Sequence, residues 1–461
     1  MGLGAVSAKA ASLDGFYGVN VQQVFSGSPA SWQPQLAAMQ SGGLQLARID
    51  ARWENVEPNP PSGGTHHYNW TLYDSIVGAL AQHYIRWYPI VDYSTDWSGV
   101  IPGDDASAVA PEHVGDFGSY AFALAKRYGP GGSFWSAHPS LPAMPVTEYE
   151  IWNEENSTTF LHPQDYAPEA YADLYMGARA AIKSADPQAR VIVGGLALGI
   201  PGVTDEVQFL QRMAAHRPDL KGNVDGVGLH PYQRSLSDTY MRLAHFRQAL
   251  DQVAGGSVPI EITELGWATT SVSEAQRATD LGALAKQLPR SDCNVDRLLP
   301  YTWLTQETNP SDPEDWFGIW NHDASAKPSG QAYTGMVRRL ATQPLSESPS
   351  DPCTQRPAAP PVAAALPVPG PRLRLRLSAD RGHRRLTVFA RCPSGCAMTV
   401  ALSRRRAAQL IPVAHRSTAF SKRRRQFRLR YPRRARVMRL DVVARGTGGG
   451  HTTRVRTLRA G

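Results

Sequence analysis

Short apolar runs alternate with amphipathic stretches between about residues 16 and 341. Apolar runs of this length, bounded by turn signals, are typical of strands that are buried on both faces. Eight such runs occur, and they predict strands at 16–21, 44–49, 86–91, 147–152, 190–195, 224–230, 260–264 and 298–303.

The segments between these strands have helical patterns, for example at 111–129, 168–186 and 273–288. Each of these three opens with Pro or Ser followed by Glu, as helix N-termini often do. Eight buried strands, each followed by a helix, predict a parallel (β/α)8 TIM barrel. The rival fold, an open doubly wound sheet, more often carries a glycine-rich phosphate turn after its first strand, and "VNVQQVFSGSP" has no such turn.

The pattern changes after residue 342. A Pro/Ala-rich stretch at 343–371 predicts an extended linker. Beyond it, short segments such as "RLRLRLS" and "LTVFARC" alternate with period two, which predicts a small antiparallel β-sandwich. We therefore expect a barrel domain at 14–342, a linker at 343–371 and an all-β domain at 372–461.

The net charge of +8 conceals a sharp division between these parts. Residues 372–461 hold 25 Lys and Arg against 2 Asp and Glu, a net +23, whereas residues 1–371 have a net −15. Such a basic domain attracts polyanions, and an anionic cell-wall polymer or acidic polysaccharide is the expected partner. Nucleic acid is disfavoured because the aromatic residues are scattered. A cationic spacer without a specific ligand is the alternative.

The four cysteines, Cys293, Cys353, Cys392 and Cys396, suggest one disulfide in each domain. A metal site would usually need four ligands, and no second Cys or His pair stands near "CPSGC". Disulfides favour an oxidising compartment, so we expect a secreted or cell-surface protein. The start "MGLGAVSAKAASLDG" is no evident signal peptide, although "AKA" resembles the end of one. No apolar run is long enough for a membrane span.

Two acids stand at the carboxyl ends of predicted strands, which is the functional face of a TIM barrel. Glu154 follows the fourth strand in "EYEIWNEENST", and Glu264 ends the seventh in "IEITELGW". Glu148 and Glu150 lie inside the fourth strand. Two carboxyl groups facing each other across the barrel mouth are what glycosidic cleavage requires. The alternative is that both are salt-bridged acids of the barrel.

Several motifs between about residues 15 and 340 resemble the clan A glycoside hydrolases, which are retaining barrel enzymes that include families 5 and 39. "WNE" resembles their strand-four signature, and "ITELGW" resembles the segment of their strand-seven nucleophile. The resemblance implies that Glu154 is the acid/base, Glu264 the nucleophile and Asn153 a ligand of the sugar's 2-hydroxyl. "YNWTLYDSIVGAL" and "FGIWNHDASAKPSGQAY" resemble family 39 more than family 5.

The same resemblance implies supporting roles for four other residues. Arg48 would hold the nucleophile ionised, His230 and Tyr232 of "GLHPY" would lie beside it, and Trp303 would form an aromatic floor for the sugar. One position departs from the family pattern, because Glu155 follows "NE" where many relatives have Pro or a small residue. We expect Glu155 either to point into solvent or to shape the leaving-group subsite.

These assignments imply retaining hydrolysis of a β-linked oligo- or polysaccharide by double displacement, without a metal or organic cofactor. The sequence contains no HExxH, P-loop or G-x-S-x-G motif. The alternative function is a carbohydrate-binding or surface-attachment protein that uses the barrel as a scaffold.

Overall fold

The computed structural model of the chain consists of two compact units, Met1–Pro357 and Ala358–Gly461. In the first unit it describes residues 13–101, 103–198, 203–342 and 353. In the second unit the described residues are 374–380, 384–391, 396–406, 409–421, 425–430, 437–445 and 451–459. Apart from Cys353, the predicted linker lies outside the described residues.

The first unit is a parallel barrel of eight strands that are neighbours in sequence order, which confirms the predicted fold class. A parallel bridge between Tyr17 and Leu298 joins the last strand to the first, and Leu298 N donates to Phe16 O at 2.8 Å. The strands are β1 (Gly18–Asn20), β2 (Leu46–Arg52), β3 (Arg86–Asp92), β4 (Glu148–Asn153), β5 (Arg190–Ala197), β6 (Gly226–His230), β7 (Ile260–Ile262) and β8 (Val295–Leu298).

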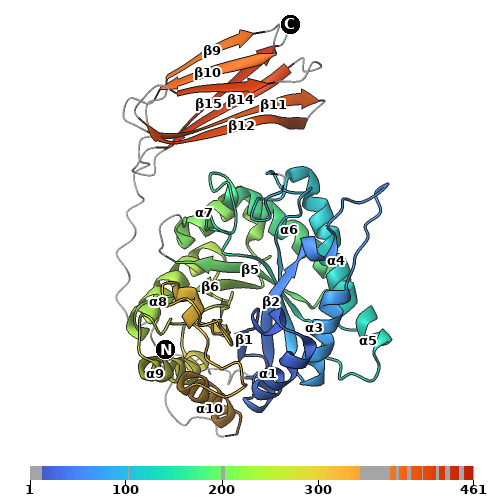
Figure 1. The fold of residues 1–461 in the computed structure, drawn as a ribbon, viewed down its shortest axis with the longest axis vertical. Helices are drawn as coiled ribbons and strands as arrows, with labels where there is room; N and C mark the ends of the chain where they lie inside the picture. Colours follow the sequence, from blue (N-terminus) through green and yellow to red (C-terminus); the bar gives the residue numbers. More distant parts are fainter. Residues whose placement is uncertain are drawn as a thin grey trace, which may run out of the picture. The chain divides into compact units, whose positions relative to one another are not determined.

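Helices surround this ring of strands (Figure 1). In α6 (Ala167–Ala185), Tyr171, Leu174, Tyr175, Ala178 and Ile182 recur every three or four residues and are all buried. Burying such an apolar side chain contributes about 1.5–3 kcal/mol, so this stripe holds α6 on the barrel. The other helices are α1 (Pro29–Ser41), α2 (Trp53–Val56), α3 (Thr71–Gln82), α4 (Val114–Tyr128), α5 (Ser133–Ala137), α7 (Glu206–His216), α8 (Leu236–Val253), α9 (Glu274–Gln287) and α10 (Pro328–Thr342).

The eighth strand differs from its prediction, because it covers Val295–Leu298 and ends where the predicted segment 298–303 begins. Pro300 lacks a backbone N–H and cannot continue a regular ladder. Residues beyond it still follow the barrel wall, since Tyr301 N donates to Leu265 O at 2.9 Å and Trp303 N donates to Asn20 O at 2.9 Å. The segment thus becomes irregular at the barrel mouth.

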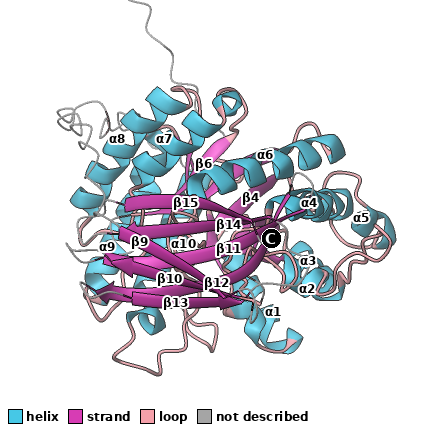
Figure 2. Cartoon of the chain, turned by 90° about the horizontal axis from the view of Figure 1, so that it is seen from above, coloured by secondary structure: helices cyan, strands magenta, loops and turns pink. Residues whose placement is uncertain are grey.

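The second unit contains two antiparallel sheets, which confirms the expected small all-β domain. Figure 2 shows β15, β14 and β11 side by side. Buried side chains from both sheets, among them Val388, Phe427, Val400 and Leu440, form one core. One sheet has the order β13-β10-β9 and the other β12-β11-β14-β15, with strands β9 (Arg374–Asp380), β10 (Arg385–Arg391), β11 (Cys396–Arg406), β12 (Gln409–Ser421), β13 (Arg425–Arg430), β14 (Val437–Arg445) and β15 (His451–Arg459).

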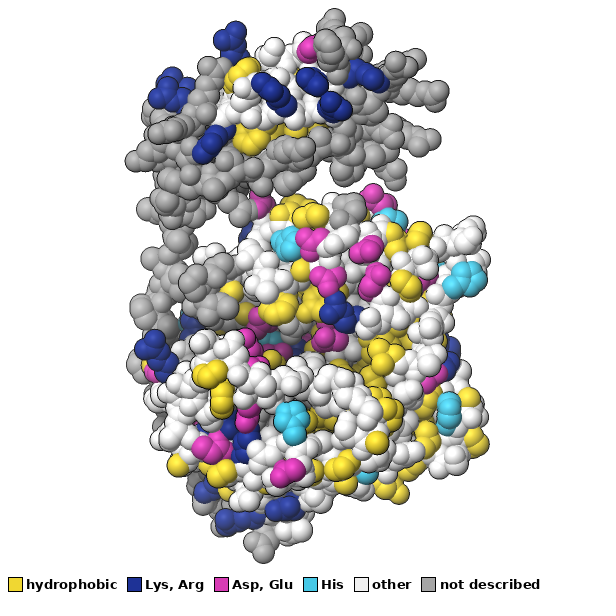
Figure 3. All heavy atoms as spheres, in the orientation of Figure 1, with side chains coloured by type: hydrophobic (Ala, Val, Ile, Leu, Met, Phe, Trp, Pro, Cys, Tyr) yellow, Lys and Arg dark blue, Asp and Glu magenta, His cyan; other side chains and the backbone are white. Residues whose placement is uncertain are grey.

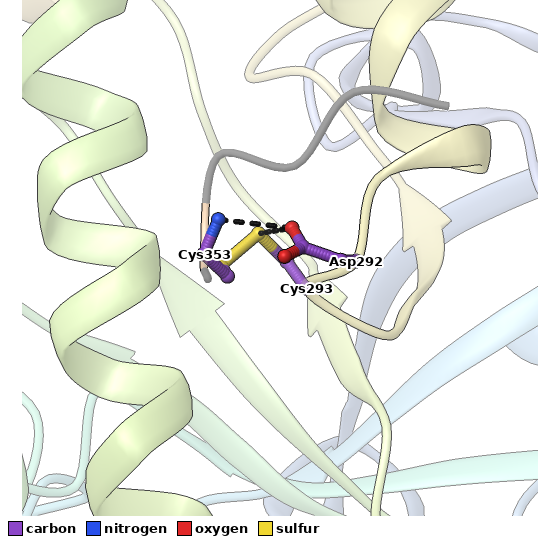
Figure 4. Close-up of side chains that lie close together, drawn as sticks. All are labelled: Asp292, Cys293 and Cys353. Atoms are coloured by element: carbon purple, nitrogen blue, oxygen red, sulfur yellow. Dashed lines mark hydrogen bonds between the residues drawn. A yellow bond between two sulfur atoms is a disulfide. The ribbon is translucent and has the colours of Figure 1, made fainter. Parts of the chain in front are cut away.

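A disulfide joins Cys293 to Cys353 and confirms the cysteine pair expected for the barrel (Figure 4). Cys353 N also donates to Asp292 Oδ1 at 2.9 Å. The bond therefore fixes residue 353 to the segment that leads into β8. The second expected pair includes Cys392, which lies outside the described residues.

In the part of the chain that the structure describes, we find no helix with the length and apolar character needed to span a membrane.

Candidate active site

Glu154 and Glu264 approach each other at the carboxyl ends of the strands. One oxygen of each carboxyl group and one nitrogen of His230 all lie within 4.8 Å of one another. Both glutamate side chains keep some exposure, 13% for Glu154 and 11% for Glu264, so a molecule in the barrel mouth can reach them. The structure thus brings together the two acids that the sequence analysis selected.

The chain leaves β4 through an unusual backbone conformation. Trp152 has a φ of 71° and Glu154 a φ of 46°, both in the left-handed region that non-glycine residues rarely adopt. Glu154 N donates to Gly195 O at 3.0 Å, which ties this turn to the neighbouring strand β5. Backbone strain of this kind persists where the surrounding structure fixes it, and it is frequent at functional sites.

Arg48 of β2 is fully buried and connects four strands. Its Nε donates to Glu150 Oε2 at 2.6 Å, and its Nη1 donates to Glu264 Oε1 at the same distance. Further bonds run from Nη2 to Asn153 Oδ1 at 2.9 Å and from Nη1 to Asn20 Oδ1 at 2.8 Å. Glu150 is therefore the inward-facing partner of Arg48 and does not face the helices.

Glu264 has surroundings that favour its ionised form. The Tyr232 hydroxyl donates a hydrogen bond of 2.8 Å to Glu264 Oε2, whereas Arg48 binds the other carboxylate oxygen, Oε1. Burial alone would raise the pKa of Glu264, but its neighbours His230, the Arg48 guanidinium and the Tyr232 hydroxyl together lower it below its ordinary value. A low pKa gives this group a negative charge at neutral pH.

His230 lies between the two acids with no exposed surface. Its Nδ1 is 2.8 Å from Glu154 Oε1 and 3.6 Å from Glu264 Oε2. Its Nε2 is 3.1 Å from the hydroxyl of Thr263, the residue that precedes Glu264. Among the residues expected at the site, Asn153, Arg48, His230 and Tyr232 thus join Glu154 and Glu264.

Trp303 does not join them, and this expectation needs correction. Its side chain is fully buried, its ring stacks on Trp320 with centroids 4.3 Å apart, and its Nε1 donates to Gln35 Oε1 at 2.8 Å. No ring face is open to a sugar. Tyr301, two residues earlier, is half-buried, and its ring centroid lies 6.4 Å from that of Tyr232. Because residues 301 and 303 are both aromatic, the sequence alone does not show which of them could contact a sugar.

Glu155 is neither solvated nor at a subsite, contrary to both expectations. Its side chain has no exposure, and burial raises its pKa well above the ordinary value. A Cβ atom added to Gly194 would lie 2.5 Å from Glu155 Oε2, so the carboxyl group packs directly against β5. The chain turns after Glu154, and the adjacent carboxyl group is consequently buried in the wall.

Several polar residues around the site were not among the predicted site residues. Asn20, at the end of β1, donates to Thr263 O and Leu299 O, each at 2.9 Å. Asp92 ends β3, and Asp50 lies two residues before the end of the neighbouring strand β2. Burial raises the pKa of each carboxyl group. Asn20 and Asp92 are at strand ends, so the rule that selected Glu154 and Glu264 could have identified these two.

Comparisons with known proteins agree with this fold. No family model and no curated protein sequence matches the chain. Among solved structures, it is similar to a family 39 glycoside hydrolase from Bacteroides cellulosilyticus WH2, with a TM-score of 0.54, 17% identity and coverage of 92% of this chain and 81% of that one.

Two further structures are similar. One is a monomeric beta-xylosidase from Caulobacter crescentus CB15, with a TM-score of 0.51, 15% identity and coverage of 90% and 93% of the two chains. The other is a glucosidase from Croceicoccus marinus, with a TM-score of 0.52, 13% identity and coverage of 98% and 95%. At such identities the likeness establishes a shared fold, and the roles of side chains must be argued from geometry.

Proposed function

We propose that this protein is a retaining glycoside hydrolase that cleaves β-linked glycosides by double displacement. The observation that carries the proposal is the approach of Glu154 and Glu264 to within 4.8 Å across the barrel mouth. Retaining enzymes place their two carboxyl groups about 5–5.5 Å apart, whereas inverting enzymes leave about 6.5–9.5 Å for a water molecule.

In the first step, a carboxylate oxygen of Glu264 attacks the anomeric carbon while Glu154 gives its proton to the glycosidic oxygen. The leaving group departs as an alcohol, and the sugar remains bound to Glu264 as an ester. Glu154, now ionised, then takes a proton from water, whose oxygen displaces Glu264 and releases a sugar of unchanged configuration. Arg48 and Tyr232 favour this assignment because both bind the proposed nucleophile and stabilise its charge.

Two of the similar structures are named as a beta-xylosidase and a glucosidase. We therefore propose β-xylosides and β-glucosides as the first substrates to examine. Tyr301 is proposed to provide the aromatic contact to the sugar that the sequence analysis gave to Trp303, because Tyr301 retains exposed surface.

The decisive experiment measures hydrolysis of a panel of aryl β-glycosides by the wild type and by Glu264→Gln and Glu154→Gln. Both changes preserve side-chain volume, and Glu112→Gln at an exposed position is the matched control. We expect Glu264→Gln to lose turnover, Glu154→Gln to lose about 10²–10⁴-fold with poor leaving groups, and the control to match the wild type. Wild-type turnover by Glu264→Gln would refute the mechanism.

The alternative is a barrel that binds sugars without cleaving them. A binding protein does not need two acids at this separation beside a cation, so the pair disfavours this function. Carbohydrate binding by the wild type with no hydrolysis of any glycoside in the panel would support the alternative.

The exposed face of the sheet β13-β10-β9 favours a second role, as a surface for acidic polymers. Six exposed arginines occupy this face, and Figure 3 shows dark blue side chains over the unit. Arg391 pairs directly with Arg374 across the strands, and such like-charged pairs destabilise a sheet. An anionic ligand would offset the repulsion. The six are Arg374, Arg376, Arg385, Arg391, Arg428 and Arg430.

We propose an anionic cell-wall polymer or acidic polysaccharide as the ligand of this face. The test compares the full chain with a variant in which Arg374, Arg376 and Arg391 are changed to Gln, and Arg338→Gln with Arg339→Gln on α10 is the control. The first variant should elute from a heparin column at a lower salt concentration than the full chain, and the control should not. Elution of both variants at the same salt concentration would exclude this face as the binding site. Stronger binding to duplex DNA than to acidic polysaccharide would indicate a nucleic-acid ligand.

The Cys293–Cys353 disulfide also supports a place of action outside the reducing cytosol. We propose an exported protein that acts on glycans at or beyond the cell surface.

A further inference from the structure

Thr263 links Glu150 to His230 in a continuous chain of buried hydrogen bonds. The Thr263 hydroxyl lies 3.0 Å from Glu150 Oε1 and 3.1 Å from His230 Nε2. The other ring nitrogen, Nδ1, lies 2.8 Å from Glu154 Oε1. The chain thus begins at the ion pair of Arg48 and Glu150 and ends at the proposed acid/base.

The direction of each bond follows from which group can donate. Glu150 accepts from the Arg48 guanidinium through both of its oxygens, so it is a carboxylate and cannot donate. The single hydroxyl proton of Thr263 must therefore point to Glu150. Thr263 can then only accept from His230, which requires a proton on Nε2.

A neutral imidazole with its proton on Nε2 has a lone pair on Nδ1. The contact between Nδ1 and Glu154 Oε1 then needs a proton from the carboxyl group. From this polarity we propose that Thr263 is a positioning residue that fixes the tautomer of His230 and thereby keeps Glu154 in its protonated, proton-donating form. The inference rests on the proposed glycosidase function for its kinetic meaning, but the tautomer itself does not depend on activity.

The packing around His230 limits the partners that its ring can reach. The ring has no exposed surface, so water cannot take the place of Thr263 as a partner. It also lies against the backbone of β5, where a Cβ atom on Gly195 would come within 1.9 Å of Nε2. The ring therefore fills the space that a side chain at residue 195 would occupy.

Other titratable groups also act on Glu154 and His230. Glu264 faces both from the segment that follows β7, and its negative charge disfavours a second negative charge on Glu154. Glu155, the next residue in the chain, also acts on Glu154, and Tyr232, Tyr301 and Glu314 do so from three other segments. A change at Thr263 leaves all of them in place, so its effect on the proton of Glu154 can be isolated.

These hydrogen bonds are compatible with both steps of the double displacement. In the first half Glu154 passes its proton to the glycosidic oxygen, and Nδ1 is left with a lone pair facing a carboxylate. That arrangement favours recapture of a proton, which Glu154 obtains from the attacking water in the second half. Protons balance over the cycle, and His230 keeps its Nε2 proton throughout.

The first experiment reads the tautomer directly by nitrogen NMR of ¹⁵N-histidine-labelled protein, with the His230 signals assigned by their loss in His230→Gln. We expect the proton on Nε2 in the wild type and in Thr263→Ser, which keeps the hydroxyl. In Thr263→Val, which has the same shape without the hydroxyl, a population with the proton on Nδ1 should appear. A wild-type spectrum with a proton on Nδ1 would overturn the proposal even if no variant folds.

The second experiment separates acid catalysis from a structural effect. Thr263→Val should lower kcat/KM about tenfold for aryl glycosides with poor leaving groups, as expected for one lost hydrogen bond. Substrates with strongly activated leaving groups need little protonation and should change less than about twofold. The basic limb of the pH profile should move to lower pH by roughly one unit, and Thr263→Ser should restore it.

Thr334→Val on α10 is the matched control, because Thr334 is buried and its hydroxyl donates to Gly330 O at 2.8 Å far from the strand ends. Equal losses for good and poor leaving groups in Thr263→Val would reduce Thr263 to a structural role and overturn the proposal. If the wild type hydrolyses no glycoside, the proposed function fails, while the NMR result still decides the tautomer.

Discussion

Arg48 and Glu150 form a two-point ion pair with no solvent exposure, in which Nε donates to Oε2 at 2.6 Å and Nη2 donates to Oε1 at 3.2 Å. The remaining guanidinium nitrogen is shared with Glu264. One buried cation therefore binds two carboxylates. Glu150 is part of the barrel wall, and Glu264 is the proposed nucleophile. This sharing couples the stability of the barrel to the charge of the nucleophile.

Replacing Arg48 by Met should consequently affect both stability and activity. It would leave Glu150 without its cation, and breaking a buried pair costs about 3–5 kcal/mol. Urea unfolding at pH 7 should show a loss of this size. Glu150→Met in the same chain should recover part of it without restoring turnover, because Glu264 would still lack Arg48. A loss below about 1 kcal/mol for the single change would contradict the ion-pair argument.

Tyr301 and Trp303 should respond in opposite ways to substitution. Tyr301→Ala removes the half-buried ring at the mouth. An aromatic contact of about 0.5–1.5 kcal/mol corresponds to roughly a twofold to tenfold fall in kcat/KM. Trp303→Phe deletes the buried bond to Gln35 and should destabilise the fold by about 1–3 kcal/mol, with kcat/KM little changed. Steady-state kinetics and urea unfolding of both variants decide between the two residues.

The disulfide between Cys293 and Cys353 should stabilise the barrel unit specifically. It joins residues separated by 60 positions, and the chain-entropy relation gives at most about 4 kcal/mol for such a loop. All 11 tryptophans lie in the first unit, so tryptophan fluorescence follows the barrel alone. Replacing Cys293 and Cys353 by Ala should shift the urea midpoint downward, while the same change at Cys392 and Cys396 should leave it in place.

The sequence predicted the barrel because buried parallel strands give an unbroken apolar signal that survives without tertiary information. It also identified Glu154 and Glu264, because the carboxyl ends of the strands form the functional face of a TIM barrel. It could not tell Tyr301 from Trp303, because which ring is buried depends on how the chain continues after Pro300. Thr263 was missed because its role depends on the direction of its hydrogen bonds, which no residue pattern records.

Glu206 provides a test of how buried charge affects stability. Its side chain has no exposure, and desolvation raises the pKa of this carboxyl group from 4.5 to about 7 despite Arg242 Nη2 at 2.8 Å. The unfolded chain releases the proton near the ordinary pKa, so between pH 4.5 and 7 the folded state binds more protons than the unfolded state. Stability must therefore fall as pH rises through this window.

Glu206→Gln removes the ionisation but still accepts from Arg242. Its free energy of unfolding should equal that of the wild type below pH 4.5 and exceed it above pH 7, with a ceiling of roughly 3 kcal/mol for the full shift. Urea unfolding at pH 4.5, 6 and 8 measures this difference, and Glu112→Gln at an exposed site should show none. A variant less stable than the wild type at pH 8 would mean that the bond to Arg242 outweighs the desolvation of the carboxylate.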